Sequence, residues 1–123
     1  MENVRALLTQ AAETAARYLE TLDDRGVAPT PEALAGLAEL HQPLAAESME
    51  PEQVLETLDR IGSPATVGMA GRRFFGFVIG ASLPAALAAN WLAGAWDQNS
   101  GLFVSSPIAT TLEEVSLGGC STS

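Results

Sequence analysis

The sequence contains no lysine. Its six basic residues are all arginine, against 15 acidic residues, and the formal net charge over 123 residues is −9. A chain without lysine cannot by itself form a Schiff base through a lysine amine. The acidic balance also argues against nucleic acid as a partner, because binding to phosphates needs a basic surface.

Residues suited to catalysis or metal binding are equally scarce. A single cysteine, Cys120, excludes an intrachain disulfide, and with one histidine, His41, a structural metal site is not expected. His41 lies in a polar stretch without a carboxylate at an evident spacing, and the serines Ser105 and Ser106 have no histidine near them in sequence. We therefore predict no catalytic residue and no metal ligand in this chain. The N-terminus has no basic start and no apolar run of a signal peptide, so a cytoplasmic location is expected.

Aromatic residues make up only 6% of the chain, and large apolar side chains are sparse over its first half. Apolar residues at helical spacing predict three one-faced helices there, over residues 3–23, 31–40 and 51–61. Thr30 followed by Pro31 predicts a side-chain cap and the first residue of the second helix. Helices of this kind need a partner surface for their apolar stripes.

The second half has a different character. Residues 73–79 are aromatic and β-branched between glycines, which predicts a short extended segment. Residues 84–96 predict a helix that is apolar almost all round, and a chain of this size cannot cover such a helix well. Ser106 and Pro107 predict the cap and start of a last helix, which we expect to end at a small polar tail from residue 118.

One segment leaves a membrane alternative open. Residues 74–96 run for 23 positions without a charge behind Arg72 and Arg73, which is long enough to span a bilayer. Pro84, Asn90 and several glycines interrupt this run, and its character changes midway. We therefore expect a covered segment of a soluble protein and no membrane partner, with a single-pass membrane protein as the alternative.

Several features of the second half occur in an order that is typical of one family. A Phe-Phe-Gly-Phe patch at 74–77 precedes a Pro-Ala-containing helix at 84–96, a Ser-Pro pair at 106–107 and a Leu-Glu helix at 112–115. In this order they resemble the group II decarboxylases that use pyridoxal 5′-phosphate (PLP), the family of aromatic amino acid decarboxylases and their bacterial relatives. The resemblance covers roughly residues 50–117.

The resemblance implies a fold and a domain organisation. The chain would be the mainly α N-terminal helical segment of a fold type I PLP-dependent enzyme, without the large α/β domain. Residues 1–72 would form a dimerisation and swap segment, 73–118 the start of the decarboxylase domain, and 119–123 a tail foreign to the family. Since the family's helix usually continues apolar at this point, we take a frameshifted product as one hypothesis for the tail. The expected partner is a second copy of the chain or a full-length paralogous subunit.

The resemblance also implies roles for particular residues. In the family, the aromatic patch helps to wall the substrate pocket, and a later stretch approaches the partner's active site. The corresponding residues here are Phe74, Phe75 and Phe77 for the pocket, and Asn99, Gly101 and Leu102 for the approach to the partner. A purely structural role of the three rings in the core stays open.

The family's catalytic groups are expected elsewhere. PLP is held through a lysine Schiff base, an aspartate at the pyridine nitrogen and a histidine stacked on the ring. The resemblance places all three in the large domain, beyond residue 118. We therefore expect a fragment of an amino acid decarboxylase that is inactive alone. The alternative from a different class is a small helical protein-interaction module.

Overall fold

The computed structural model describes residues 3–43, 47–77, 79 and 81–122, with side chains up to Gly119. The described chain is mainly helical and contains no strand, which confirms the predicted mainly α class. It divides into two compact units, Met1–Ala81 and Ser82–Ser123, and each is described by itself. The limits predicted from the family resemblance, 72 and 118, stay predictions.

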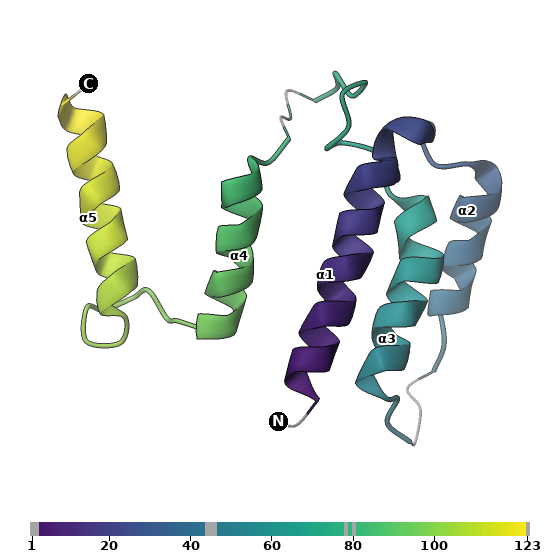
Figure 1. The fold of residues 1–123 in the computed structure, drawn as a ribbon, viewed down its shortest axis with the longest axis horizontal. Coiled ribbons are helices and arrows are strands. Elements are labelled where there is room, and N and C mark those ends of the chain that lie inside the picture. Colours follow the sequence, from purple (N-terminus) through teal and green to yellow (C-terminus); the bar gives the residue numbers. More distant parts are fainter. Residues whose placement is uncertain (1–2, 44–46, 78, 80, 123) are drawn as a thin grey trace. The chain divides into compact units, whose positions relative to one another are not determined.

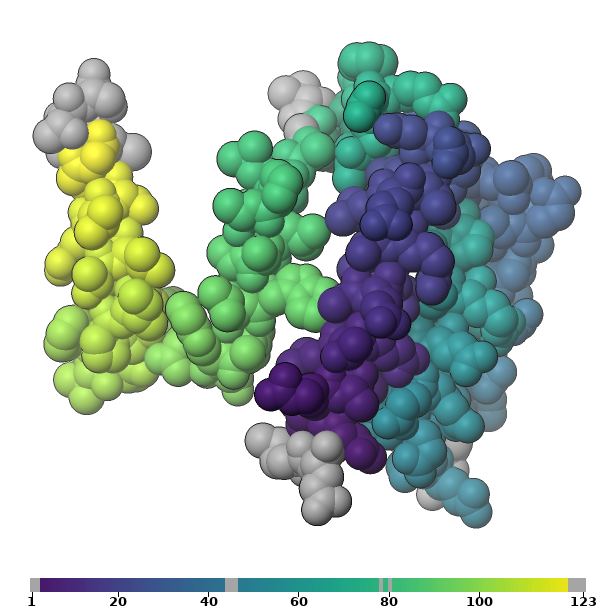
Figure 2. Space-filling model, in the orientation of Figure 1, coloured from purple at the N-terminus to yellow at the C-terminus, as the bar shows by residue number. Residues whose placement is uncertain are grey.

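The first unit consists of three helices with short irregular extensions. Within it, α1, α2 and α3 lie side by side (Figure 1), and side chains of α1 contact those of α3 (Figure 2). Their bounds are Val4–Thr21 for α1, Pro31–Gly36 for α2 and Pro51–Thr57 for α3. α1 continues into a 3-10 turn at Leu22–Asp24, and α2 into another at Leu37–Leu40. α3 continues into a π-helical turn at Leu58–Gly62, which is followed by a 3-10 turn at Ser63–Ala65. The three predicted helices are confirmed, although the regular α part of the second and third is shorter than predicted.

The start of α2 has the predicted cap. The Thr30 hydroxyl accepts a hydrogen bond from the Ala33 N–H at 3.1 Å, and Pro31 occupies the first helical turn. Proline is favourable there because its fixed φ suits a helix and its missing N–H would have no intrahelical partner. The cap and the proline together therefore determine where α2 begins.

The hydrophobic core of the first unit is small. Among the described residues, only Leu22 and Ile61 are buried apolar side chains, at 5% and 6% exposure. Polar contacts add to the packing of α1 against the α3 region. The Gln10 side chain donates to the Glu52 carbonyl at 3.2 Å, and Arg17 pairs with Asp59 at 2.6 Å. The first unit therefore depends on a few buried positions and on polar bridges at its surface.

The second unit contains α4 (Pro84–Trp96) and α5 (Pro107–Thr122). The bounds of α4 agree with the prediction, and so does the cap of α5, because the fully buried Ser106 accepts a hydrogen bond from the Ala109 N–H at 3.3 Å. The predicted end of this helix at residue 118 is wrong, since α5 continues to Thr122. No proline follows Pro107 to stop it, and each glycine only lowers helix propensity by about 1 kcal/mol.

The apolar surface of α4 is not covered within the second unit. No residue of α4 is buried, and Leu83, Leu92 and Trp96 are all exposed. The sequence predicts a helix that needs cover, and α5 by itself does not bury it. No helix among the described residues has both the length and the apolar character needed to cross a membrane.

The predicted extended segment at 73–79 does not form a strand in the described residues. Residues Arg72 and Arg73 form a turn, and Phe77 lies in a further turn with a left-handed φ of 56°. Val78 and Gly80 lie outside the described residues. A strand needs a neighbour to pair with its backbone groups, and the described chain has no other strand. The aromatic and β-branched composition alone therefore does not produce a strand in the described part of this segment.

Candidate functional site

The aromatic segment, residues 74–77, presents two of its rings to solvent. Phe75 and Phe77 are 90% and 83% exposed, whereas Phe74 is half-buried. The rings of Phe74 and Phe77 lie 6.4 Å apart between centroids and are tilted by 30°. Offset or tilted pairs at such separations are favourable for aromatic rings. The segment thus forms an exposed apolar surface and is not part of the core of the described chain.

Two backbone features hold the rings of Phe74 and Phe77 together. The left-handed φ of Phe77 is rare for a bulky residue and carries an energetic cost. At Gly76, an added Cβ would lie 3.3 Å from the Cζ atom of Phe74, so a side chain at this position would crowd that ring. The compact bend of this segment therefore depends on a glycine and on a strained phenylalanine.

The base of the aromatic segment is a glycine turn that packs against the end of α1. The Gly68 N–H donates to the Val27 carbonyl at 2.8 Å, and the Gly71 N–H donates to the Gly68 carbonyl at 3.1 Å. A Cβ at Gly71 would lie 3.3 Å from that carbonyl oxygen and 3.5 Å from Cγ of the buried Leu22. These close approaches explain why small residues occupy both positions.

The second predicted segment, residues 99–102, is a separate polar turn. The Asn99 side-chain oxygen accepts from the Gly101 N–H at 2.9 Å, which is the geometry of an Asx turn. The Leu102 carbonyl accepts from the N–H groups of Ser105 and Ser106 at 3.1 and 3.0 Å. Leu102 itself is exposed. The turn thus leads into α5 and leaves an apolar side chain at its surface.

The structure brings the predicted site residues together within each segment. Phe74, Phe75 and Phe77 belong to the first unit, and Asn99, Gly101 and Leu102 belong to the second. Each group is defined locally, by ring contacts in one case and by turn hydrogen bonds in the other. The predicted roles of both groups toward a substrate or a partner stay predictions.

Nucleophilic and basic groups of the described chain have structural roles or lie at the surface. The Ser105 hydroxyl donates to the carbonyls of Asn99 and Leu102, at 3.0 and 2.8 Å, and the Ser106 hydroxyl caps α5. His41 is exposed in a loop. The side chain of Cys120 lies outside the described residues. Within the described part, no three metal-ligating side chains gather in one place.

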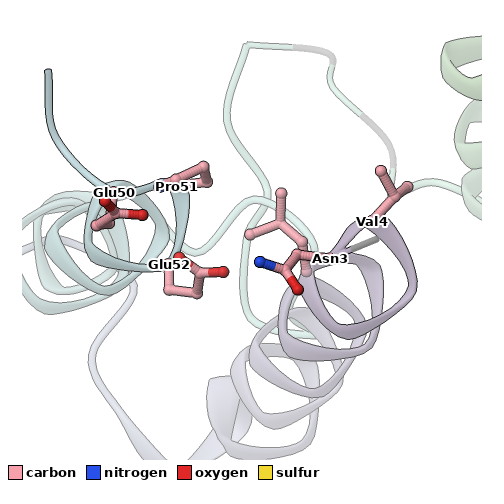
Figure 3. Close-up of a pocket in the computed structure, with 6 residues that line it drawn as sticks. Asn3, Val4, Glu50, Pro51 and Glu52 are labelled. Atoms are coloured by element: carbon pink, nitrogen blue, oxygen red, sulfur yellow. The ribbon is translucent and has the colours of Figure 1, made fainter. Parts of the chain in front are cut away.

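One shallow pocket of about 220 Å³ lies between the beginnings of α1 and α3 (Figure 3). Asn3 and Glu52 are polar groups at its edge, and Glu52 comes from the first turn of α3. The pocket contains neither a nucleophile nor a histidine. Its lining residues are Asn3, Val4, Leu7, Glu50, Pro51 and Glu52. The sequence predicts helices that contain Val4, Leu7 and Pro51 but no site at these residues. The only sequence signal for the pocket is the position of the two helix starts.

The residues of this chain do not by themselves fit PLP. The sequence has no lysine for a Schiff base, and the one histidine, His41, is exposed in a loop. The carboxylate at the base of the aromatic segment, that of Asp23, accepts a hydrogen bond from the Arg72 N–H and lies 3.5 Å from Nε of Arg72. We therefore assign no step of cofactor chemistry to them.

Sequence reasoning also missed how the aromatic segment is attached. Arg73 donates to two main-chain carbonyls beyond α1, those of Asp23 and Arg25. Arg72 and Arg73 stood out in the sequence only as charges in front of an apolar run.

Comparison with known proteins leaves the family undetermined. No family model, no curated protein and no solved structure matches this chain.

Proposed function

We propose that this chain is an N-terminal segment of a group II PLP-dependent amino acid decarboxylase, a carboxy-lyase of fold type I. In this proposal it contributes to a dimer and to the wall of a substrate pocket, and it has no decarboxylase activity alone. The observation that carries the proposal is the ordered series of the Phe-Phe-Gly-Phe patch, the helix beginning at Pro84, the Ser106-Pro107 pair and the Leu-Glu helix.

The exposure of the aromatic segment supports a role in a pocket completed by another chain. Phe75 and Phe77 offer flat apolar surface that costs free energy to leave in water, since apolar stabilisation follows the area removed from water. The uncovered α4 supports association in the same way. Contiguous exposed apolar surface is typical of protein interfaces and ligand sites.

Each group of residues has a defined part in this proposal. The rings of Phe74, Phe75 and Phe77 pack against an amino acid side chain, and the turn of Asn99, Gly101 and Leu102 approaches the partner's active site. The partner is a second copy or a full-length paralogous subunit in the cytoplasm. That subunit or a large domain supplies the lysine, the aspartate and the histidine for PLP, because this chain has no lysine.

The experiment is complementation in trans. A group II decarboxylase is prepared without the segment that corresponds to residues 1–118, and CO₂ release from aromatic amino acids is measured after this chain is added. The enzyme's own N-terminal segment serves as the positive control. We expect this chain to restore activity and Phe77→Ala to reduce the restored activity at least tenfold, whereas Phe103→Ala, an exposed phenylalanine of the second unit, leaves it within twofold.

Two results would contradict the proposal. The first is restoration by the enzyme's own segment but not by this chain. The second is activity of this chain alone, seen as CO₂ release from aromatic amino acids after PLP is added. Neither is compatible with a chain that supplies only pocket and dimer surface.

A helical protein-interaction module is the second candidate, and the uncovered apolar surface of α4 favours it equally. Sedimentation and urea unfolding distinguish the two candidates. A stable monomer with one cooperative unfolding transition supports the module. Self-association, or dependence on the decarboxylase subunit for a cooperative transition, supports the decarboxylase segment.

A further inference from the structure

The two arginines before the aromatic segment differ in what they contact. One nitrogen of the Arg73 guanidinium, Nη2, donates to the carbonyl oxygens of Asp23 and Arg25 at 2.8 and 2.5 Å. The Arg72 side chain is 91% exposed, and its Nε lies 3.5 Å from the Asp23 carboxylate. Arg73 is therefore bound to the main chain, whereas Arg72 makes a loose ion pair at the surface.

The two carbonyls that Arg73 contacts lie where the chain leaves α1. Asp23 is in the last turn of the helical run, and Arg25 is extended, with φ −120° and ψ 165°. Carbonyl groups at a helix C-terminus lack intrahelical partners, and a cation is favourable beside them. A guanidinium NH₂ group carries two hydrogens, so one nitrogen can satisfy both acceptors. Lysine cannot reproduce this well, because its side chain is one bond shorter and lacks the planar fork.

Other contacts bring the chain to the same place without involving the Arg73 side chain. The Arg72 N–H donates to the Asp23 carboxylate at 3.3 Å, and the Gly68 N–H donates to the Val27 carbonyl. The loop that follows α3 thus returns to the C-terminal end of α1, as Figure 1 shows within the first unit. Arg73 contacts the end of α1 and directly precedes Phe74, whose own N–H donates to the Gly71 carbonyl at 3.4 Å.

We propose that Arg73 is a positioning residue for the aromatic segment. It attaches the base of residues 74–77 to the end of α1, so that the rings are held in one arrangement on the first unit. The importance of this arrangement for a substrate pocket rests on the proposed function. The attachment itself does not, because it follows from the contacts of Arg73 alone.

The test uses the full chain labelled with fluorophenylalanine and observed by ¹⁹F NMR. The chain has four phenylalanines, three in the aromatic segment and one, Phe103, in the second unit, which serves as an internal reference. We expect Arg73→Met to move the resonances of Phe74 and Phe77, whose rings contact each other, toward those of the urea-unfolded chain, with Phe103 unchanged. Arg72→Met is the matched control, because it removes the same charge from the neighbouring residue. It should leave all four resonances in place.

Partial rescue by a conservative variant distinguishes positioning from general stability. Arg73→Lys keeps the charge and a donor, and we expect its segment resonances to lie between those of the wild type and Arg73→Met. Far-UV circular dichroism of each variant reports whether α1 to α3 remain folded. If Arg73→Met unfolds the first unit, Arg73→Lys decides the question: intact helices with shifted segment resonances support the proposal, and wild-type resonances overturn it.

Equal ¹⁹F spectra for Arg73→Met and Arg72→Met would overturn the proposal. A loss of helices in both Arg73 variants would also overturn it, because Arg73 would then support the whole first unit. These outcomes are independent of complementation. The wild-type chain could fail to restore decarboxylation while Arg73→Met still shifts the segment resonances. This result would reject the proposed function and support the positioning role of Arg73.

Discussion

The guanidinium of Arg25 lies over the ring of Tyr18, with Cζ 4.7 Å from the ring centroid. The same guanidinium donates to the Ser63 carbonyl at 2.9 Å and to the Thr66 hydroxyl at 2.5 Å. The Tyr18 and Thr66 hydroxyls are 2.8 Å apart and share a hydrogen bond. These four residues close a ring of contacts between the C-terminal part of α1 and the turns after α3.

Replacing Arg25 tests this ring of contacts. We expect Arg25→Met to lower the free energy of unfolding of the first unit by about 1–2 kcal/mol, because it removes a cation–π contact and two hydrogen bonds at a partly exposed site. The measurement is urea unfolding followed by far-UV circular dichroism. Arg5→Met removes the same charge from an exposed position of α1 and should change the free energy by less than about 0.5 kcal/mol. Equal unfolding midpoints for the two variants would rule out the role assigned to Arg25.

The small core predicts an unequal response to truncation of leucines. Leu22→Ala should destabilise the first unit by about 2–3 kcal/mol, because Leu22 is buried beside the glycine turn and its loss leaves a cavity. Leu8 lies in α1 but is 50% exposed, and Leu8→Ala should cost about 1 kcal/mol or less. Thermal unfolding of both variants under the same conditions provides the comparison. A larger loss for Leu8 would show that the core lies elsewhere.

The left-handed φ of Phe77 predicts a stabilising substitution. Asparagine tolerates this conformation better than phenylalanine, and Phe77 is mostly exposed, so little buried area is lost. We expect Phe77→Asn to raise the free energy of unfolding by about 0.5–1 kcal/mol, as measured by urea titration. Phe75 is equally exposed but has an ordinary negative φ, and Phe75→Asn should be neutral or slightly destabilising. A gain of the same size in both variants would point to general surface polarity instead of backbone strain.

Prolines made the helix starts predictable from the sequence. Pro31, Pro51, Pro84 and Pro107 each lie in the first turn of a helix, where the ring suits the backbone and no hydrogen bond is lost. The helix ends were less predictable. Glycine only weakens a helix, so the glycines near the end of α5 did not end it at residue 118 as expected.

The sequence also singled out the aromatic residues but not their support. The acceptors of Arg73 are main-chain carbonyls 50 and 48 residues away, at Asp23 and Arg25. Every residue has a main-chain carbonyl, so no pattern of side chains in the sequence indicates which carbonyls Arg73 contacts. The extended segment expected for residues 73–79 forms no strand in the described residues for a related reason, since a strand depends on a neighbour that the local sequence does not specify.

What the sequence by itself determined is local: the absence of lysine chemistry, the mainly α class, and the residues where helices begin, because proline geometry and hydroxyl caps act within a few residues. Only the tertiary structure decided which side chains are buried, that the loop after α3 returns to the end of α1, and that Phe77 adopts a left-handed bend with its ring exposed. The burial and the return of the loop depend on contacts between residues about 40 to 50 positions apart, which are set by packing and by main-chain hydrogen bonds in space. The bend at Phe77 depends on how the rings and Gly76 pack within its own segment.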